Sequence, residues 1–167
     1  MRVITKIGDI FSVNINKKSK KYMQYIANDI TQLNSDVIRA FKKTYTIDDN
    51  PNLEEIVKDE IHFYAHCVLK FGIKMDLWKK VGNNKDVVSL NNILFRGTKD
   101  YGHKIGTELI KVSDNWHVWK INDDKFTHIG NLIGDYKKAE IGIIVNPNDI
   151  VERITTGKYS FFYPDYR

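Results

Sequence analysis

The stretch Gly8–Asp29, GDIFSVNINKKSKKYMQYIAND, decides the fold of this 167-residue chain. Two β-rich runs flank a polar segment, the first with Ile10, Phe11, Val13 and Ile15 and the second with Tyr22, Met23, Tyr25 and Ile26. The polar segment holds Lys17, Lys18, Lys20 and Lys21. Two β-branched and aromatic runs joined by a polar turn predict an antiparallel hairpin. We expect the rest of the chain to complete an antiparallel sheet, or a small and partly open barrel, around this hairpin.

The composition is that of an ordinary globular domain. Hydrophobic residues make up 42% and charged residues 28%, which predicts one folded domain over residues 1–167. No apolar run approaches the roughly 18–20 residues of a membrane-spanning helix. The N-terminus has no apolar region of the kind found in secretory signals, so we expect a cytoplasmic protein. With Cys67 as the only cysteine, an intrachain disulfide is excluded.

Two segments carry helix signals in an otherwise strand-rich, α+β sequence. The first is predicted at about 51–59, with Asn50 as the N-cap and Pro51 at the first helical position. The second is predicted at about 147–156, where Asn146 and Pro147 begin the helix and Gly157 ends it.

Most of the remaining segments read as strands, which we expect at 61–69, 93–96, 115–121, 126–130, 139–145 and 159–163. Residues 35–45 fit either a strand or a helix, and their β-branched and aromatic content favours a strand. Residues 71–81 fit a second strand pair or a short amphipathic segment. Alternation along 116–121 predicts that Trp116 and Trp119 point to opposite faces.

The polar residues of the segment 61–69 do not form a catalytic or metal signature. On a strand, His62 and His66 share one face about 13 Å apart, too far for one metal ion. We therefore interpret them as outward-facing polar side chains on a half-buried strand. Cys67 lies in an apolar run, which is typical of an inert, buried thiol. We expect no catalytic residue, no metal and no cofactor.

Charge is distributed unevenly along a chain whose net charge is +5. Six acids gather between residues 48 and 60, namely Asp48, Asp49, Glu54, Glu55, Asp59 and Glu60, against the single base Lys58. This acidic segment is either the solvated face of a helix or a docking surface for a basic protein. Nucleases are often basic because they bind polyanions, so an inhibitor of a nuclease commonly presents acids.

Three short motifs resemble a bacterial family. Gly8–Phe11 (GDIF), Tyr22–Ile26 (YMQYI) and Ile150–Tyr159 (IVERITTGKY) are similar to the immunity protein 26 family of polymorphic toxin and contact-dependent inhibition systems. The resemblance implies an α+β, non-enzymatic cytoplasmic protein that binds and neutralises a cognate toxin, usually a nuclease or another toxic enzyme domain. The candidate contacts are then the acidic segment and the aromatic residues Trp116 and Trp119.

Two other functions remain open from the residues alone. The first is a β-barrel nucleic-acid-binding protein that uses Lys17, Lys18, Lys20, Lys21, Tyr22 and Tyr25, because lysines beside exposed aromatic rings suit single strands. The second is a small hydrolase or nuclease around His103, with Lys99 and Lys104 as cations, because histidine titrates near neutral pH.

Overall fold

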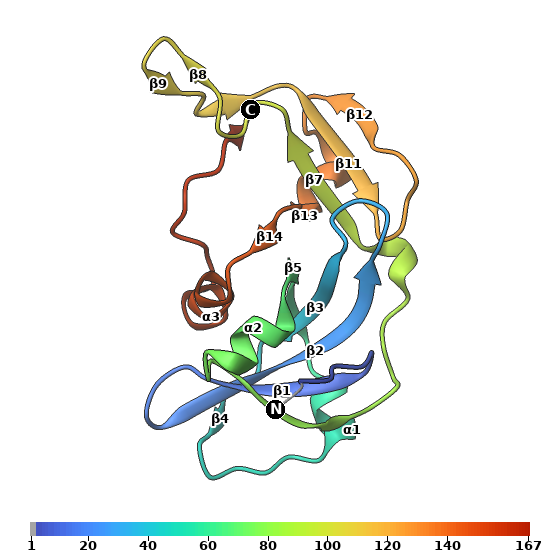
Figure 1. Ribbon diagram of the computed structural model, residues 1–167, viewed down its shortest axis with the longest axis vertical. Helices are drawn as coiled ribbons and strands as arrows, with labels where there is room; N and C mark the ends of the chain where they lie inside the picture. The colour runs from blue at the N-terminus through green and yellow to red at the C-terminus, as the bar shows by residue number, and fades with distance from the viewer. Residues whose placement is uncertain (1–2) are drawn as a thin grey trace.

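The N-terminal hairpin is the centre of the larger of two main sheets. In this computed structural model, which describes residues 3–167, strands β1 (Asp9–Asn14) and β2 (Ser19–Asp29) pair antiparallel with Phe11 opposite Met23 (Figure 1). The sheet has the order β14-β5-β3-β2-β1-β6, and β4 pairs with β2. Its other strands are β3 (Ser35–Phe41), β4 (Tyr45–Thr46), β5 (Ile61–Cys67), β6 (Lys79–Asn83) and β14 (Ile144–Val145). The predicted hairpin is therefore confirmed, and the strand favoured for residues 35–45 forms over Ser35–Phe41 but is interrupted at residues 42–44 before β4.

A second sheet has the order β12-β11-β7-β13. Its strands are β7 (Leu94–Thr98), β11 (Trp116–Lys120), β12 (Thr127–Gly130) and β13 (Glu140–Ile141). Two short ladders join β8 (Lys104–Ile105) to β9 (Glu108–Leu109) and β10 (Val112–Ser113) to β15 (Asp165–Tyr166). All sheets of the described chain are open and none closes into a barrel. The expected antiparallel pairing holds except that β14 is parallel to β5, β13 to β7 and β10 to β15.

Three α-helices complete the single α+β domain formed by residues 3–167: α1 (Leu53–Val57), α2 (Leu69–Lys74) and α3 (Pro147–Thr156). Two 3₁₀ helices, η1 (Leu90–Asn92) and η2 (Gly134–Lys138), lie beside the second sheet. Asn146 caps α3 and Gly157 ends it at φ 88°, as predicted. The cap of α1 is Asn52 and not Asn50, because the Asn52 side chain accepts the Glu55 N–H. No helix among residues 3–167 is long and apolar enough to cross a membrane.

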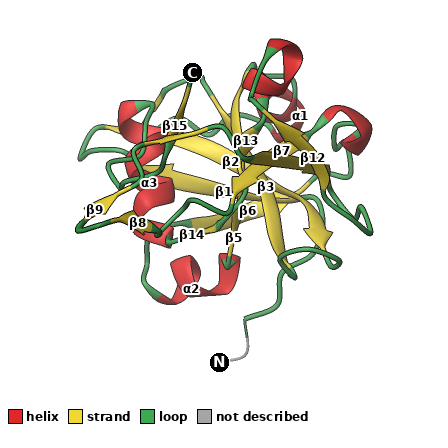
Figure 2. Ribbon diagram, turned by 90° about the horizontal axis from the view of Figure 1, so that it is seen from above, coloured by secondary structure: helices red, strands yellow, loops and turns green. Residues whose placement is uncertain are grey.

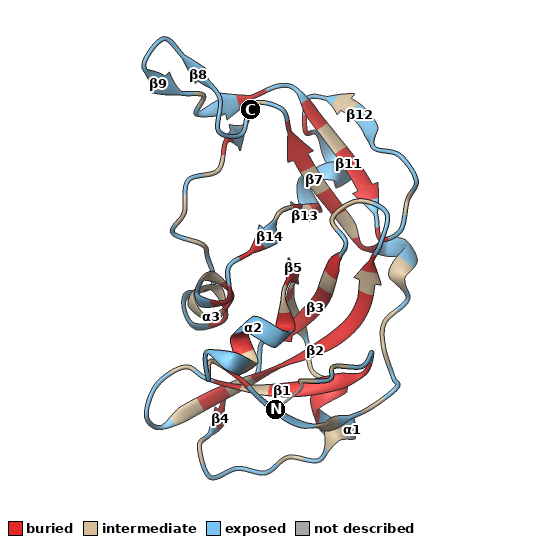
Figure 3. Ribbon diagram, in the orientation of Figure 1, coloured by how far each residue is buried: buried red, intermediate tan, exposed pale blue. Residues whose placement is uncertain are grey.

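The central strands of the larger sheet are mostly buried (Figure 3), and the helices lie around the strands (Figure 2). On one face Phe11, Met23 and Phe63 pack with Leu69 of α2 and Ile150 of α3. The alternate residues, including Ile10, Tyr22 and Phe41, pack on the other face with Ile56 of α1. A sheet covered on both faces explains the long apolar runs of its central strands.

Three expectations for local structure need correction. Residues 71–81 form neither a strand pair nor one amphipathic segment, because α2 begins at Leu69 and β6 follows it. Gly72 permits this packing, since a Cβ there would lie 1.9 Å from the Trp78 ring. Tyr159–Tyr163 is not a strand; Tyr159 and Phe161 pack against the core instead, and pairing begins at Asp165. Residues 139–145 form two strands rather than one.

The connecting segment Glu140–Val145 joins the two main sheets. Its first half, β13, pairs parallel with β7, and its second half, β14, pairs parallel with β5. Between the halves, the Gly142 N–H donates to the Arg96 carbonyl at 2.8 Å. A Cβ on Gly142 would lie 2.0 Å from the Trp119 ring, so only glycine allows this close approach. Both sheets are thus held by one six-residue stretch.

Candidate functional site

The acidic segment forms an exposed ridge between β4 and α1, which we call the acidic ridge (Asp48–Glu55). The turn at Asn50 and Pro51 lines two hollows, one of about 380 Å³ and one of about 410 Å³. The smaller hollow is also lined by Lys43 and Glu55, and the larger by Leu53 and Val81. The exposed turn of the acidic ridge therefore borders two hollows, each lined by both apolar and polar side chains.

Many acids of the segment 48–60 are already paired within the protein. Glu55 lies 2.7 Å from Lys43 Nζ, and Glu60 forms an ion pair with Lys42. The carboxylates of Asp49 and Asp59 accept backbone N–H groups at 2.8 Å, from Thr46 and Lys43 respectively. Within the described chain, the side chains of Asp48 and Glu54 are the two of the six without a hydrogen bond or ion pair. The negative charge available to a partner is thus smaller than the sequence indicates.

The two candidate tryptophans lie in the core and not on the surface. Trp116 is 0% and Trp119 2% exposed. As the alternation predicted, they pack in different clusters, Trp116 with Val118 and Trp119 with Ile121. Trp116 Nε1 donates to the Ser113 carbonyl at 2.9 Å. Both side chains stabilise the second sheet, so they do not present a contact surface in this structure.

Asp29 is the centre of a buried polar cluster that the sequence did not reveal. His66 Nε2 and Trp119 Nε1 lie 2.9 and 3.1 Å from Asp29 Oδ2, and the Asn122 N–H donates to Oδ1 at 3.1 Å. Burial alone raises the pKa of Asp29, but these hydrogen bonds outweigh it and hold the pKa below its ordinary value. Burial lowers the pKa of His66. A neutral His66 therefore donates to an ionised Asp29.

This cluster corrects the interpretation of His66 as an outward-facing residue. His66 is 0% exposed and contacts the Phe95 ring of the second sheet. The predicted burial of Cys67 is confirmed, since it is 0% exposed, and burial raises the pKa of its thiol. Residues 3–167 contain no group of three or more His, Cys, Asp or Glu side chains that could hold a metal ion.

The residues of the two alternative functions do not assemble into a site. Tyr22 and Tyr25 are 3% and 7% exposed, so their rings are not available to stack on bases. Lys20 is also buried, and its Nζ donates to the Ile47 carbonyl at 2.8 Å. His103, with Lys99 and Lys104, lies on the exposed loop that leads into the β8–β9 ladder.

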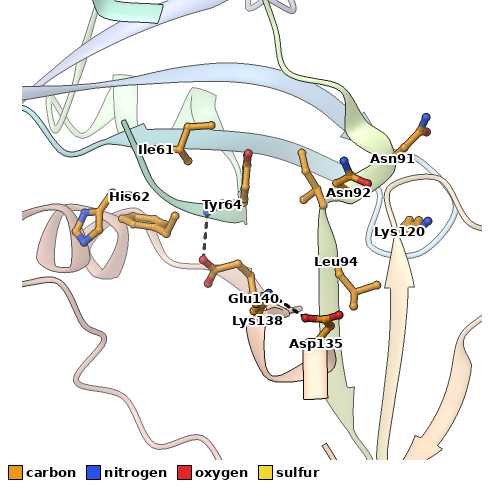
Figure 4. A pocket seen from close by; sticks show the side chains of 12 residues that line it. Ile61, His62, Tyr64, Asn91, Asn92, Leu94, Lys120, Asp135, Lys138 and Glu140 are labelled. Carbon is orange, nitrogen blue, oxygen red and sulfur yellow. Dashed lines mark hydrogen bonds and ion pairs between the residues drawn. The ribbon is translucent and has the colours of Figure 1, made fainter. Parts of the chain in front are cut away.

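A groove of about 630 Å³ separates the edge of β5 from the second sheet (Figure 4). Ile61, His62 and Tyr64 line one side, and Leu94 and Lys120 are among the residues opposite. Glu140 crosses between the sheets: its Oε1 accepts the Tyr64 N–H at 3.4 Å, and both carboxylate oxygens bind Arg153, at 2.7 and 3.2 Å. Segments distant in sequence form this groove, which is why no motif predicted it.

The comparison with known families gives one result. The family model described as Immunity protein 26 matches residues 6–104, more than half of the chain. No curated protein and no solved structure matches the chain significantly. The matched range includes the hairpin and the acidic ridge, whereas the similar motif at 150–159 lies outside it. An immunity protein implies a cognate toxin as its partner. The chain belongs to the Immunity protein 26 family.

Proposed function

We propose that this protein neutralises its toxin by binding it directly, without an enzymatic activity of its own, and that the toxin is a basic, nuclease-type domain. The observation that supports the proposal is the acidic ridge, which lies within the range matched by the family model. Its exposed Asp48 and Glu54 have no partner in the described chain and so remain free to pair with cations of another protein.

The surroundings of the ridge suit a protein interface. A typical interface combines an apolar centre with charged groups at its rim. Beside the ridge, Val81 is 46% exposed and Leu53 is partly exposed at the larger hollow. In such an arrangement the free carboxylates attract a basic partner from a distance, and the hollows receive its side chains.

Charge reversal tests the ridge. In the double variant Asp48→Lys, Glu54→Lys, we expect affinity for the purified toxin to fall about tenfold or more, mainly through slower association that is less sensitive to salt. The matched control is Asp114→Lys, Asp124→Lys, since both acids are exposed in the turns before and after β11 and make no ion pair within the described chain. Equal affinities of the two double variants, measured by surface plasmon resonance, would overturn the role of the ridge.

A titration tests the absence of catalysis and the nature of the toxin. Increasing amounts of the protein are added to a fixed amount of toxin while degradation of DNA and RNA is followed. We expect inhibition to be complete at one protein per toxin, and His103→Ala to give the same endpoint. Complete inactivation at a small fraction of that ratio would indicate an enzyme. A toxin that leaves both nucleic acids intact would contradict the nuclease assignment.

A further inference from the structure

A second hollow, of about 320 Å³, lies beside the groove between the sheets and has a strongly positive lining. We call it the basic hollow. Its cationic side chains come from β7, η2, α3 and the segment after α3: Arg96, Lys137, Lys138, Arg153 and Lys158. Glu140 is the one carboxylate in the lining. No sequence motif predicted this site, because Arg96, the residues 137–141 and the residues 153–159 come from three separate parts of the chain.

Two of the five cations are already neutralised. Arg153 holds both oxygens of Glu140, and Lys138 Nζ lies 2.9 Å from Asp135 Oδ1. The uncompensated cations are therefore Arg96, Lys137 and Lys158, which form no ion pair within residues 3–167. All three charges line the same hollow.

Arg96 is the unusual member of this group. Its Nη1 donates to the Ala139 carbonyl at 2.6 Å, and its guanidinium lies over the Trp116 and Tyr166 rings. Its Nε is buried and has no hydrogen-bond partner in the described chain. Lys137 Nζ also lies over the Tyr166 ring, 5.5 Å from its centre. Arg96 is partly buried and forms no ion pair within residues 3–167, so an added anion beside it would be favourable.

We propose that the basic hollow binds a ligand that carries phosphate groups, of the size of a diphosphate. Phosphate oxygens accept paired hydrogen bonds from the planar guanidinium group of arginine, and they are attracted by the compact charge of a lysine ammonium group. The volume lies at the lower end of the range for small-molecule pockets, about 300–1,000 Å³. The lining has the opposite charge to the acidic ridge, so the basic partner proposed for the ridge does not suit this site. The two proposals are independent.

Calorimetry of the full chain with pyrophosphate at low salt tests the proposal. We expect saturable binding at one site that weakens as salt is added. The variant Lys137→Gln, Lys158→Gln is expected to bind about tenfold more weakly. Both lysines are exposed, so their loss spares the core. The matched control, Lys17→Gln, Lys125→Gln, removes two exposed charges from other turns and is expected to bind like the unmodified protein.

Three outcomes would overturn the phosphate assignment. The first is an absence of saturable pyrophosphate binding. The second is an equal loss of affinity in both double variants, which would indicate a general effect of net charge. The third is tighter binding of a pentaglutamate peptide than of pyrophosphate, which would indicate an acidic protein segment as the ligand. None of these measurements requires the toxin, so their failure leaves the proposed function unaffected.

Discussion

At the residue scale, Asp29 is the side chain on which both main sheets depend. It lies at the end of β2, and it receives His66 from the same sheet and Trp119 from the second. Its ionised carboxylate accepts hydrogen bonds from His66, Trp119 and the Asn122 N–H and donates none. A buried carboxylate is stable only when its hydrogen bonds are satisfied, so the cluster fixes the relative position of three strands.

We expect Asp29→Asn to lower the free energy of unfolding by about 1–3 kcal/mol. His66 and Trp119 donate to Oδ2 and the Asn122 N–H donates to Oδ1, so in either orientation of the amide its NH₂ group faces at least one of these donors, which loses its acceptor. Urea unfolding followed by tryptophan fluorescence measures the change. Asp124→Asn, at an exposed position, serves as the control and is expected to change stability by less than about 0.5 kcal/mol.

Stability should also fall as the pH is lowered below 6.5, the ordinary pKa of histidine in the unfolded chain. Burial lowers the pKa values of His62, His66 and His117 in the folded protein. Between the folded pKa values and 6.5, the unfolded state binds more protons, and protonation therefore favours unfolding. Urea unfolding at pH 7.5 and at about pH 5.5, where most carboxylates stay ionised, measures this effect. Equal stability at the two pH values would contradict it.

Sequence reasoning at this scale succeeds where the environment is local. The apolar neighbours of Cys67 in its own strand are enough to predict a buried thiol. His66 has the same neighbours, but its burial depends on Phe95 and Trp119, which belong to a different sheet. The acidic segment shows the same limit, because Lys42 and Lys43 neutralise acids that lie 12 to 18 positions later in the chain.

At the element scale, the adjacent residues that bound α3 predict its ends correctly, whereas Asn50 and Pro51 place the start of the first helix too early, because Asn52 caps α1. Aromatic content also misleads. The start and end of α3 follow from Asn146, Pro147 and Gly157 alone. Tyr159–Tyr163 resembles a strand in composition, yet its rings are used for packing: Tyr159 stacks on Phe161, and its ring also contacts Arg153. Composition cannot separate these uses, because both favour aromatic side chains.

We expect Asn146→Ala to destabilise the protein by about 1 kcal/mol, through loss of the cap of α3. The Asn146 side chain accepts the Asn148 N–H at 3.0 Å. Asn148→Ala is the matched control, because that position contributes only its backbone N–H to the cap and should change stability by less than about 0.5 kcal/mol. Thermal unfolding measures both variants. An equal loss in the two would show that the cap does not stabilise the fold.

At the scale of the whole molecule, the range matched by the family model is not a folding unit. Residue 104 is the last matched residue, and β7 is the only strand of the second sheet before it. Both neighbours of β7 in that sheet, β11 and β13, come later in the chain. The strand-rich class was predictable from the sequence, but this interleaving of the two sheets was not, since pairing partners are far apart.

We expect a chain that ends at residue 104 to lack cooperative thermal unfolding. It would expose Phe95, leave β7 without a neighbour, and remove Trp119 and Asn122 from Asp29. Circular dichroism and amide NMR dispersion measure the outcome. The control replaces residues 104–109 by two glycines, because every residue of this ladder is exposed and its loss spares both cores. A cooperative transition in the truncated chain would refute the expectation.

The connecting segment Glu140–Val145 also has a consequence for biosynthesis. β14 is the outermost strand of the larger sheet, yet the ribosome makes it long after β5, the strand with which it pairs. Throughout that interval the nascent chain carries β5 with one edge uncovered, a state that is open to aggregation. Because this segment supplies one strand to each main sheet, we expect a chain that is released before residue 140 to leave β5 and β7 each without one of its partner strands.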